Sequence, residues 1–378
     1  MPNYDGIITS ALIYPLIASA GISGALVLTK SLHGRFSLDN HEGVQKFHTV
    51  PTPRIGGIAL FASLVVASLL SGSATGGLLG LMIIAGLPAF ISGIIEDLTK
   101  RVGVRERLLA TICSGLLAIF ITGYKLDYIN VPGFDTMLAY APCAIAFTAF
   151  AVGGVANAIN IIDGFNGLAG GVLMICFGTM GLIAFQVGDM QIVNICLIST
   201  VCVAGFMLLN FPFGKIFMGD GGAYFMGFMV AWIAVMLPMR NPQVSPWAPI
   251  VACAYPIIET IVSMIRRSWQ RTGTGKADSA HLHSLIKINI IRRMFPDVPQ
   301  HLRNAMVSPL CWLITLTFSV PAFMFYRDTR MLMLTAVCCL IVYVLFYNGV
   351  TQLNPVNPDQ ATVTEDGERE PKKPTAFA

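Results

Sequence analysis

Continuously apolar stretches, separated by short polar segments, recur along the whole chain. Most are close to the roughly 20 residues that a helix needs to cross a hydrocarbon core. Because the runs are continuous rather than alternating, they predict helices, which satisfy their own backbone in lipid, and not barrel strands. The predicted spans are 7–29, 55–71, 76–95, 107–123, 137–156, 168–186, 190–209, 221–238, 247–265, 307–326 and 331–348. The pattern therefore predicts an all-α, polytopic integral membrane bundle of about 11 transmembrane helices.

Composition agrees with a membrane bundle, and the distribution of charge predicts how the bundle is oriented in the membrane. The 378 residues are 55% hydrophobic and only 12% charged, against roughly 25% charged in an average soluble domain. Of the 24 lysines and arginines, 20 lie in one alternating set of loops, which the positive-inside rule places in the cytoplasm. We therefore expect a periplasmic N-terminus, a cytoplasmic C-terminus and residence in the bacterial inner membrane. The net charge of +4 reflects topology and does not indicate nucleic-acid binding. The nine cysteines show no Cys-x-x-Cys spacing and are read as small apolar residues.

The chain divides into one transmembrane domain, 1–351, and a polar tail, 352–378. The tail is rich in Pro, Thr and charged residues, which cannot bury a core, so we predict that it is disordered. The loops expected in the cytoplasm are 30–54, 96–107, 157–167, 210–220 and 266–306.

Polar clusters lie on this predicted cytoplasmic side, where spans begin or end. Carboxylates at a membrane edge are costly, so several on one face indicate a polar site. The first cluster contains Lys46, His48 and Arg54 in a loop stiffened by Pro51 and Pro53. It is either an anion-binding loop or a positively charged topology anchor.

The second cluster is the acidic pair Glu96 and Asp97, followed one helical turn later by Lys100. Adjacent acids at that depth repel each other. Mg²⁺ or a shared proton would relieve the repulsion, which would indicate a functional site. Alternatively, the acids form ion pairs with Lys100 and Arg101 and have only a structural role.

The third cluster spaces Asn157, Asn160 and Asp163 three residues apart at the end of an apolar helix, which keeps them in one sector. Helix capping explains one of them but not the series.

In the fourth cluster, Asp220 stands among glycines before a span. It is either a ligand-binding acid or an ordinary N-cap.

The fifth cluster places His281 and His283 in the longest loop, after several arginines. No further histidine or cysteine stands at zinc-ligand spacing, so two interpretations remain: phosphate binding, or a merely solvated loop.

Taken together, the clusters place oxygen ligands beside cations. This combination favours binding of Mg²⁺, with Mn²⁺ as the alternative, and of a diphosphate. Together they describe phosphoryl transfer.

The order of these motifs resembles the polyprenyl-phosphate N-acetylhexosamine-1-phosphate transferase family over about residues 1–350. The resemblance implies that a UDP-amino-sugar donates its sugar phosphate to undecaprenyl phosphate and releases UMP, initiating O-antigen, capsule or a related glycan. It implies that Asp220 and Asn160 are Mg²⁺ ligands, and that Asp163 lies near metal and nucleotide. It further implies that Asn166 and Phe217 hold the uracil, and that Asp97 faces the lipid phosphate. Direct attack by that phosphate is preferred over a covalent intermediate, and a homodimer stays open.

Three positions depart from the family pattern. Glu96 stands where an aspartate is usual, Asn166 replaces the second aspartate of the uracil motif, and the histidine cluster shortens to His281-Leu-His283-Ser284. Because of the last two departures, the phospho-MurNAc-pentapeptide transferases of peptidoglycan synthesis are a weaker match. Outside this family, a secondary transporter requires acids near the bilayer midplane, and a non-catalytic scaffold requires no such carboxylate face.

Overall fold

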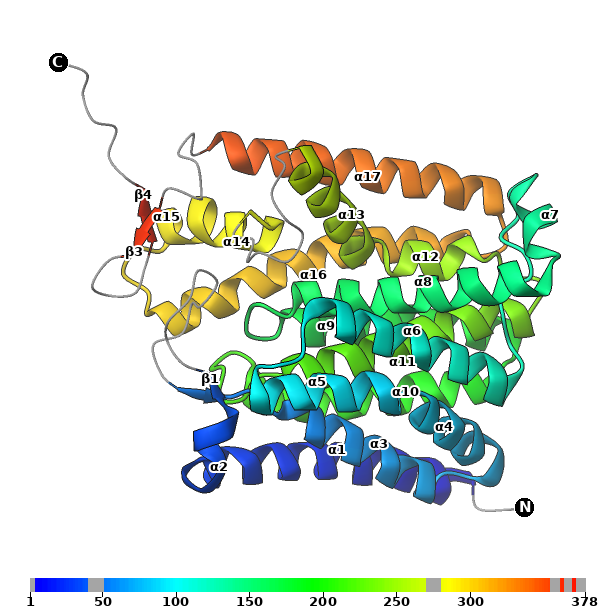
Figure 1. Cartoon of the computed structure of the whole chain (residues 1–378), viewed down its shortest axis with the longest axis horizontal. Helices are drawn as coiled ribbons and strands as arrows, with labels where there is room; N and C mark the ends of the chain where they lie inside the picture. The colour runs from blue at the N-terminus through cyan, green and yellow to red at the C-terminus, as the bar shows by residue number, and fades with distance from the viewer. Residues whose placement is uncertain (1–3, 40–50, 270–279, 354–360, 364–368, 372–378) are drawn as a thin grey trace.

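The computed structural model describes residues 4–39, 51–269, 280–353, 361–363 and 369–371, and it is helical apart from short strands (Figure 1). Strand β1 (Leu38–Asp39) pairs antiparallel with β2 (Thr52–Pro53), and β3 (Ala361–Val363) with β4 (Arg369–Pro371). The helices are α1 (Tyr4–Leu28), α2 (Lys30–Ser37), α3 (Gly56–Leu70), α4 (Ser73–Ala85), α5 (Leu87–Thr99), α6 (Val104–Thr122), α7 (Phe134–Leu138), α8 (Ala141–Ile162), α9 (Leu168–Val187), α10 (Met190–Asn210), α11 (Gly219–Arg240), α12 (Trp247–Ala252), α13 (Ala254–Trp269), α14 (Leu282–Ile286), the π-helix η1 (Lys287–Ile291), α15 (Arg292–Met294), α16 (Gln300–Met324) and α17 (Thr329–Gln352).

Helix α11 forms the centre of the bundle. It packs against α3, α5, α8 and α9, and nearly all its residues are buried, Trp232 completely. The long helices run along the long axis of the molecule, with α1 and α17 on opposite sides (Figure 1). Helix α17 exposes large apolar side chains such as Leu334 and Leu345, as expected of a surface that faces lipid.

The prediction of a multi-pass membrane bundle is confirmed. Each predicted span falls on a helix or on a helix broken in two. In the part of the chain that the structure describes, six helices are long and apolar enough to cross a membrane: α8, α9, α10, α11, α16 and α17. The number rises to 8 if the bent pairs α1/α2 and α4/α5 each form one span. The figure of 11 spans and the direction of the termini stay predictions.

Some of the expected loops and spans differ from the structure; the predicted loop 30–54, for example, contains α2, and the predicted span 247–265 is divided between α12 and α13. The predicted span 76–95 bends by 51° at Gly86, between α4 and α5. The predicted loop 266–306 is partly helical, because it contains α14, η1, α15 and the start of α16. Of the predicted tail, the structure describes only the first residues and the β3–β4 pair, so its disorder stays a prediction.

Candidate active site

The start of α11 is held by the side chain of Asp97, near the end of α5. Its two carboxylate oxygens accept hydrogen bonds from the backbone N–H groups of Asp220 and Gly221, each at 2.9 Å. The carboxylate is completely buried, and Arg54 Nη2 lies 3.5 Å from Oδ1. The first N–H groups of a helix have no partner within the helix and favour a negative charge. Asp97 therefore caps α11 from another helix.

Glycines allow this close approach of α5 and α11. Gly219 has φ +72°, and a Cβ there would clash with the Arg54 carbonyl oxygen and lie 2.6 Å from Asp97 Oδ2. A Cβ on Gly93 would lie 2.5 Å from the Asp220 carbonyl carbon. Only glycine fits at either position without a shift of backbone.

Asp220 meets cationic and amide groups from three other segments. Asn160 Nδ2 donates to Oδ1 at 2.8 Å, Arg107 Nη1 pairs with Oδ2, and Arg54 Nη2 lies 3.9 Å from the same oxygen. The Arg107 guanidinium also lies over the Tyr224 ring, 5.6 Å from its centroid. The carboxylate thus lies among positive charges, as expected at a site that attracts an anion.

Asp163 follows the last residue of α8 and adds a third carboxyl to this end of the bundle. The protein around it raises its pKa to about 7 by desolvation, although Arg54 and a hydrogen bond from the Gly219 backbone act to lower it. A carboxyl with such a pKa exchanges protons readily near neutrality. The local chain places it there because α8 ends one residue earlier and the Gly164–Gly167 turn leads into α9.

The oxygen donors fit Mg²⁺, which binds one or two protein groups and completes its shell with phosphate and water. Asp220 and the amide oxygen of Asn160 are the candidate ligands, since their side chains already touch. Among the described residues, no group of three His, Cys, Asp or Glu side chains is arranged as a metal site.

The other acidic and amide candidates lie beside this centre but have local partners. Glu96 Oε2 accepts the Val102 N–H at 2.8 Å, and Lys100 Nζ donates to the Asp97 carbonyl at 3.1 Å. Asn157 Oδ1 accepts the Tyr224 hydroxyl at 3.2 Å. Asn157 and Asn160 both lie in the last turns of α8, so the helix on which their predicted spacing depends is present.

Asn166 and Phe217, expected to hold a uracil, stand in different environments. Asn166 is almost fully buried, and its Nδ2 donates to the carbonyls of Pro212 and His301. Phe217 is partly exposed, and its backbone pairs with Pro53 and Gly56, which ties the loop before α3 to the loop before α11. The uracil contacts of both stay predictions.

His281 and His283 lie in a buried cluster next to the Asp163 turn. Their rings stack with centroids 5.2 Å apart, and the His283 ring meets the Phe165 ring edge to face at 5.5 Å. His281 Nδ1 lies 2.9 Å from Oε1 of Glu259, on α13. The interpretation as a solvated loop therefore does not describe these two side chains. Lys46 and His48 lie outside the described residues.

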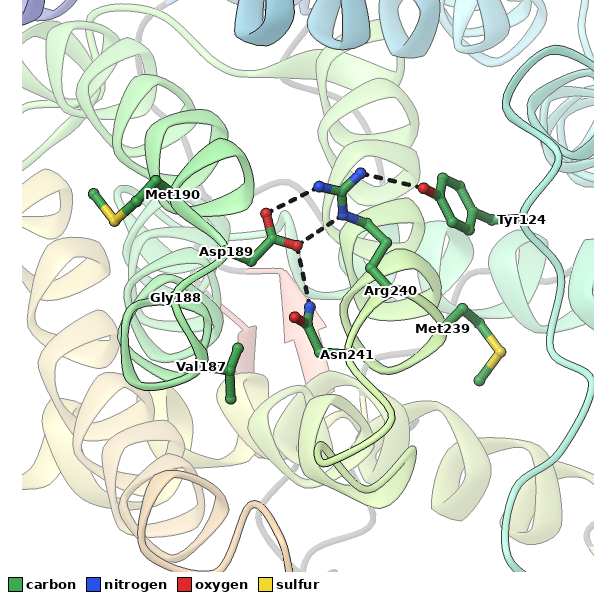
Figure 2. A pocket seen from close by; sticks show the side chains of 8 residues that line it. All are labelled: Tyr124, Val187, Gly188, Asp189, Met190, Met239, Arg240 and Asn241. Atoms are coloured by element: carbon green, nitrogen blue, oxygen red, sulfur yellow. Dashed lines mark hydrogen bonds and ion pairs between the residues drawn. The ribbon is translucent and has the colours of Figure 1, made fainter.

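A cavity of about 570 Å³ opens at the other end of the molecule (Figure 2). There Arg240 makes a two-pronged ion pair with Asp189 and donates to the Tyr124 hydroxyl, and Asn241 also donates to Asp189. Desolvation acts to raise the pKa of Asp189, but hydrogen bonds from Arg240 and Asn241 outweigh it and lower that pKa. These polar groups satisfy one another, so the network ties the α9–α10 loop to the end of α11.

Sequence reasoning missed two residues that contact candidate site residues. Arg107 was counted only as a topology charge, although it contacts Asp220. Glu259 was not noted at all, although a lone acid within the predicted span 247–265 is by itself a sign of function.

Comparisons with known proteins agree with the motifs. Residues 79–238 match the family model described as glycosyl transferase family 4. The chain is 27% identical over 310 residues to a probable undecaprenyl-phosphate N-acetylglucosaminyl 1-phosphate transferase of Bacillus subtilis, covering 82% of this chain and 83% of the relative. It is 26% identical to an undecaprenyl-phosphate alpha-N-acetylglucosaminyl 1-phosphate transferase of Yersinia pestis, covering 69% and 72%. It is also 26% identical to a decaprenyl-phosphate N-acetylglucosaminephosphotransferase of Mycobacterium tuberculosis, covering 85% and 86%. The resemblance predicted from the motifs is confirmed.

Proposed function

We propose, on the premise of this similarity to glycosyl transferase family 4, that the chain transfers an N-acetylhexosamine 1-phosphate from a UDP-sugar to undecaprenyl phosphate. The products are an undecaprenyl-diphosphate sugar and UMP, and the reaction initiates a cell-envelope glycan such as O-antigen or capsule. The observation that carries the proposal is the meeting of Asp97, Asp163 and Asp220 with Arg54 and Arg107 at one end of the bundle.

In the reaction, an oxygen of the lipid phosphate attacks the sugar-bound phosphorus of the donor, and the bond between the two phosphates breaks. UMP leaves with the electron pair. Mg²⁺, held by Asp220 and Asn160, would neutralise the charge of the diphosphate. Arg54 and Arg107 attract the same anion, and Asp163 is able to take a proton near neutral pH.

The positions of the acids favour an enzyme over a transporter. Asp97 lies near the end of α5, Asp163 directly follows α8, and Asp220 begins α11. A carrier needs its acids near the middle of its spans, where substrate is exposed alternately to the two sides. We place this end in the cytoplasm of a bacterium and the protein in its inner membrane, because 20 of the 24 lysines and arginines lie in the loops that the sequence assigns to this side.

The test is release of UMP by purified protein in detergent, given undecaprenyl phosphate and a panel of UDP-N-acetylhexosamines. We expect release that requires both the lipid and Mg²⁺ or Mn²⁺, and that stops when a chelator is added. Turnover that continues in the chelator would contradict the metal role. Folded protein that acts on none of the donors would contradict the proposed reaction.

A further inference from the structure

A buried acid behind the histidine cluster has no part in the roles described above. Glu259 lies on α13, and its side chain is completely buried. A carboxylate in such a place is costly unless it is well paired. Its partners therefore indicate why it is there.

Two other segments supply those partners. Oε1 lies 2.9 Å from His281 Nδ1 and 3.2 Å from the Leu282 N–H, while Oε2 accepts the Tyr343 hydroxyl of α17 at 2.7 Å. Ser263 Oγ lies 3.0 Å from the same His281 nitrogen. The group thus joins α13, the start of α14 and α17 around one imidazole ring.

The chemistry of the pair fixes the state of the ring. An ionised carboxylate only accepts hydrogen bonds, so Nδ1 of His281 must carry a proton. When the ring also carries a proton on Nε2, this N–H at the opposite edge is a donor suited to phosphate. A carboxylate behind a functional histidine sets its orientation and tautomer in other protein sites.

Side-chain contacts connect the His281 ring to the candidate active site. His281 stacks on His283, and His283 meets Phe165, two residues after Asp163. A Cβ on Gly164 would lie 3.6 Å from His283 Nε2, so the histidine pair packs directly on the turn that carries Asp163.

We propose that Glu259 is a positioning residue for donor binding: with Tyr343, it holds His281 so that the Nε2 edge of the ring donates to the diphosphate of the UDP-sugar. This inference rests on the proposed function for the identity of the ligand. The arrangement of Glu259, Tyr343 and His281 is independent of that function and is tested separately.

The first experiment measures the ring itself. Histidine labelled with ¹⁵N in the purified full chain gives signals for only 6 residues, and His281→Gln identifies the signal of His281 by its loss. We expect a protonated Nδ1 with a strongly downfield proton in the wild type, and loss of that shift in Glu259→Gln. An unprotonated Nδ1 in the wild type would overturn the inference.

The second experiment measures donor and lipid separately by UMP release. We expect Glu259→Gln to raise the KM for the UDP-sugar by about tenfold to hundredfold, as for loss of a hydrogen bond to a charged group, with the KM for undecaprenyl phosphate unchanged. Tyr343→Phe should act in the same direction by about threefold to tenfold, and it serves if Glu259→Gln does not fold.

The matched control is Asp189→Asn, which makes the same carboxylate-to-amide change in the network at the opposite end of the molecule. It should lower the melting temperature without changing either KM. If Glu259→Gln and Tyr343→Phe behave like this control, the inference is wrong. A wild type that shows the expected ring signal but releases no UMP would overturn the proposed function and leave the Glu259–His281 pair supported.

Discussion

Replacing Asp97 by asparagine separates its capping of α11 from any role in catalysis. Both of its oxygens accept backbone N–H groups of α11, at 2.9 Å, from a side chain with no exposed surface. Asparagine keeps one acceptor and turns an NH₂ group toward the other N–H, which is then buried without a partner. The negative charge at the helix N-terminus is also lost.

The expected cost follows from these contacts. A hydrogen bond to a charged group contributes about 1.5–3 kcal/mol, and the cost of burying the charge offsets its further attraction to the helix N-terminus. Since one acceptor survives, we expect Asp97→Asn to lower the free energy of unfolding by about 1.5–3 kcal/mol. In domains of 150–250 residues each kcal/mol lowers the melting temperature by about 2–4 °C, so a fall of about 3 °C or more is expected.

The assay is thermal unfolding of the purified variant in detergent, followed by intrinsic fluorescence. Glu96→Gln is the matched control, because the neighbouring side chain is partly exposed, accepts one N–H from Val102 and keeps an acceptor as glutamine. We expect it to melt close to the wild type. A variant Asp97→Asn that is inactive but melts within about 1 °C of the wild type would refute the capping role and leave only a catalytic one.

Three further changes test other parts of the structure. Asp220→Ala should lower UMP release at least about hundredfold, because the candidate metal ligand is lost, while a cooperative melting transition remains; wild-type turnover would exclude the metal role. Arg240→Leu should lower the free energy of unfolding by about 2–4 kcal/mol, since Asp189 loses its cationic partner, with donor KM unchanged; an unaltered melting curve would contradict this. Removal of 356–378 should leave UMP release within about twofold, and an inactive truncated protein would show that the tail contributes to the site.

The helices were predictable from sequence because lipid requires each span to be both long and apolar, and hydropathy measures these two properties directly. Bends leave a weaker signal. Gly86 and Pro88 stand at the break, but they interrupt a stretch that is apolar on both sides, so one span was predicted where α4 and α5 meet at 51°.

The candidate site was predictable only as a set of local clusters. Asp97, Asp163 and Asp220 each stand at the end of a span, and this regularity places them at one end of the bundle. Their contacts could not be predicted, because the Asp97–Asp220 hydrogen bond joins residues 123 positions apart. Arg107 was missed because it lies in a predicted cytoplasmic loop, where a positive charge is already expected from the topology.

Helix α11 carries a further consequence, for the bilayer that surrounds the protein. Asp220 and Arg240, held by polar partners near its two ends, are separated along the helix by about 30 Å at 1.5 Å per residue. That separation matches the hydrocarbon thickness of an ordinary bilayer. Because α11 is buried and packed on several sides, it cannot tilt freely to absorb a mismatch. The stability of this protein should therefore depend on membrane thickness. Lipids with shorter or longer chains should lower its free energy of unfolding.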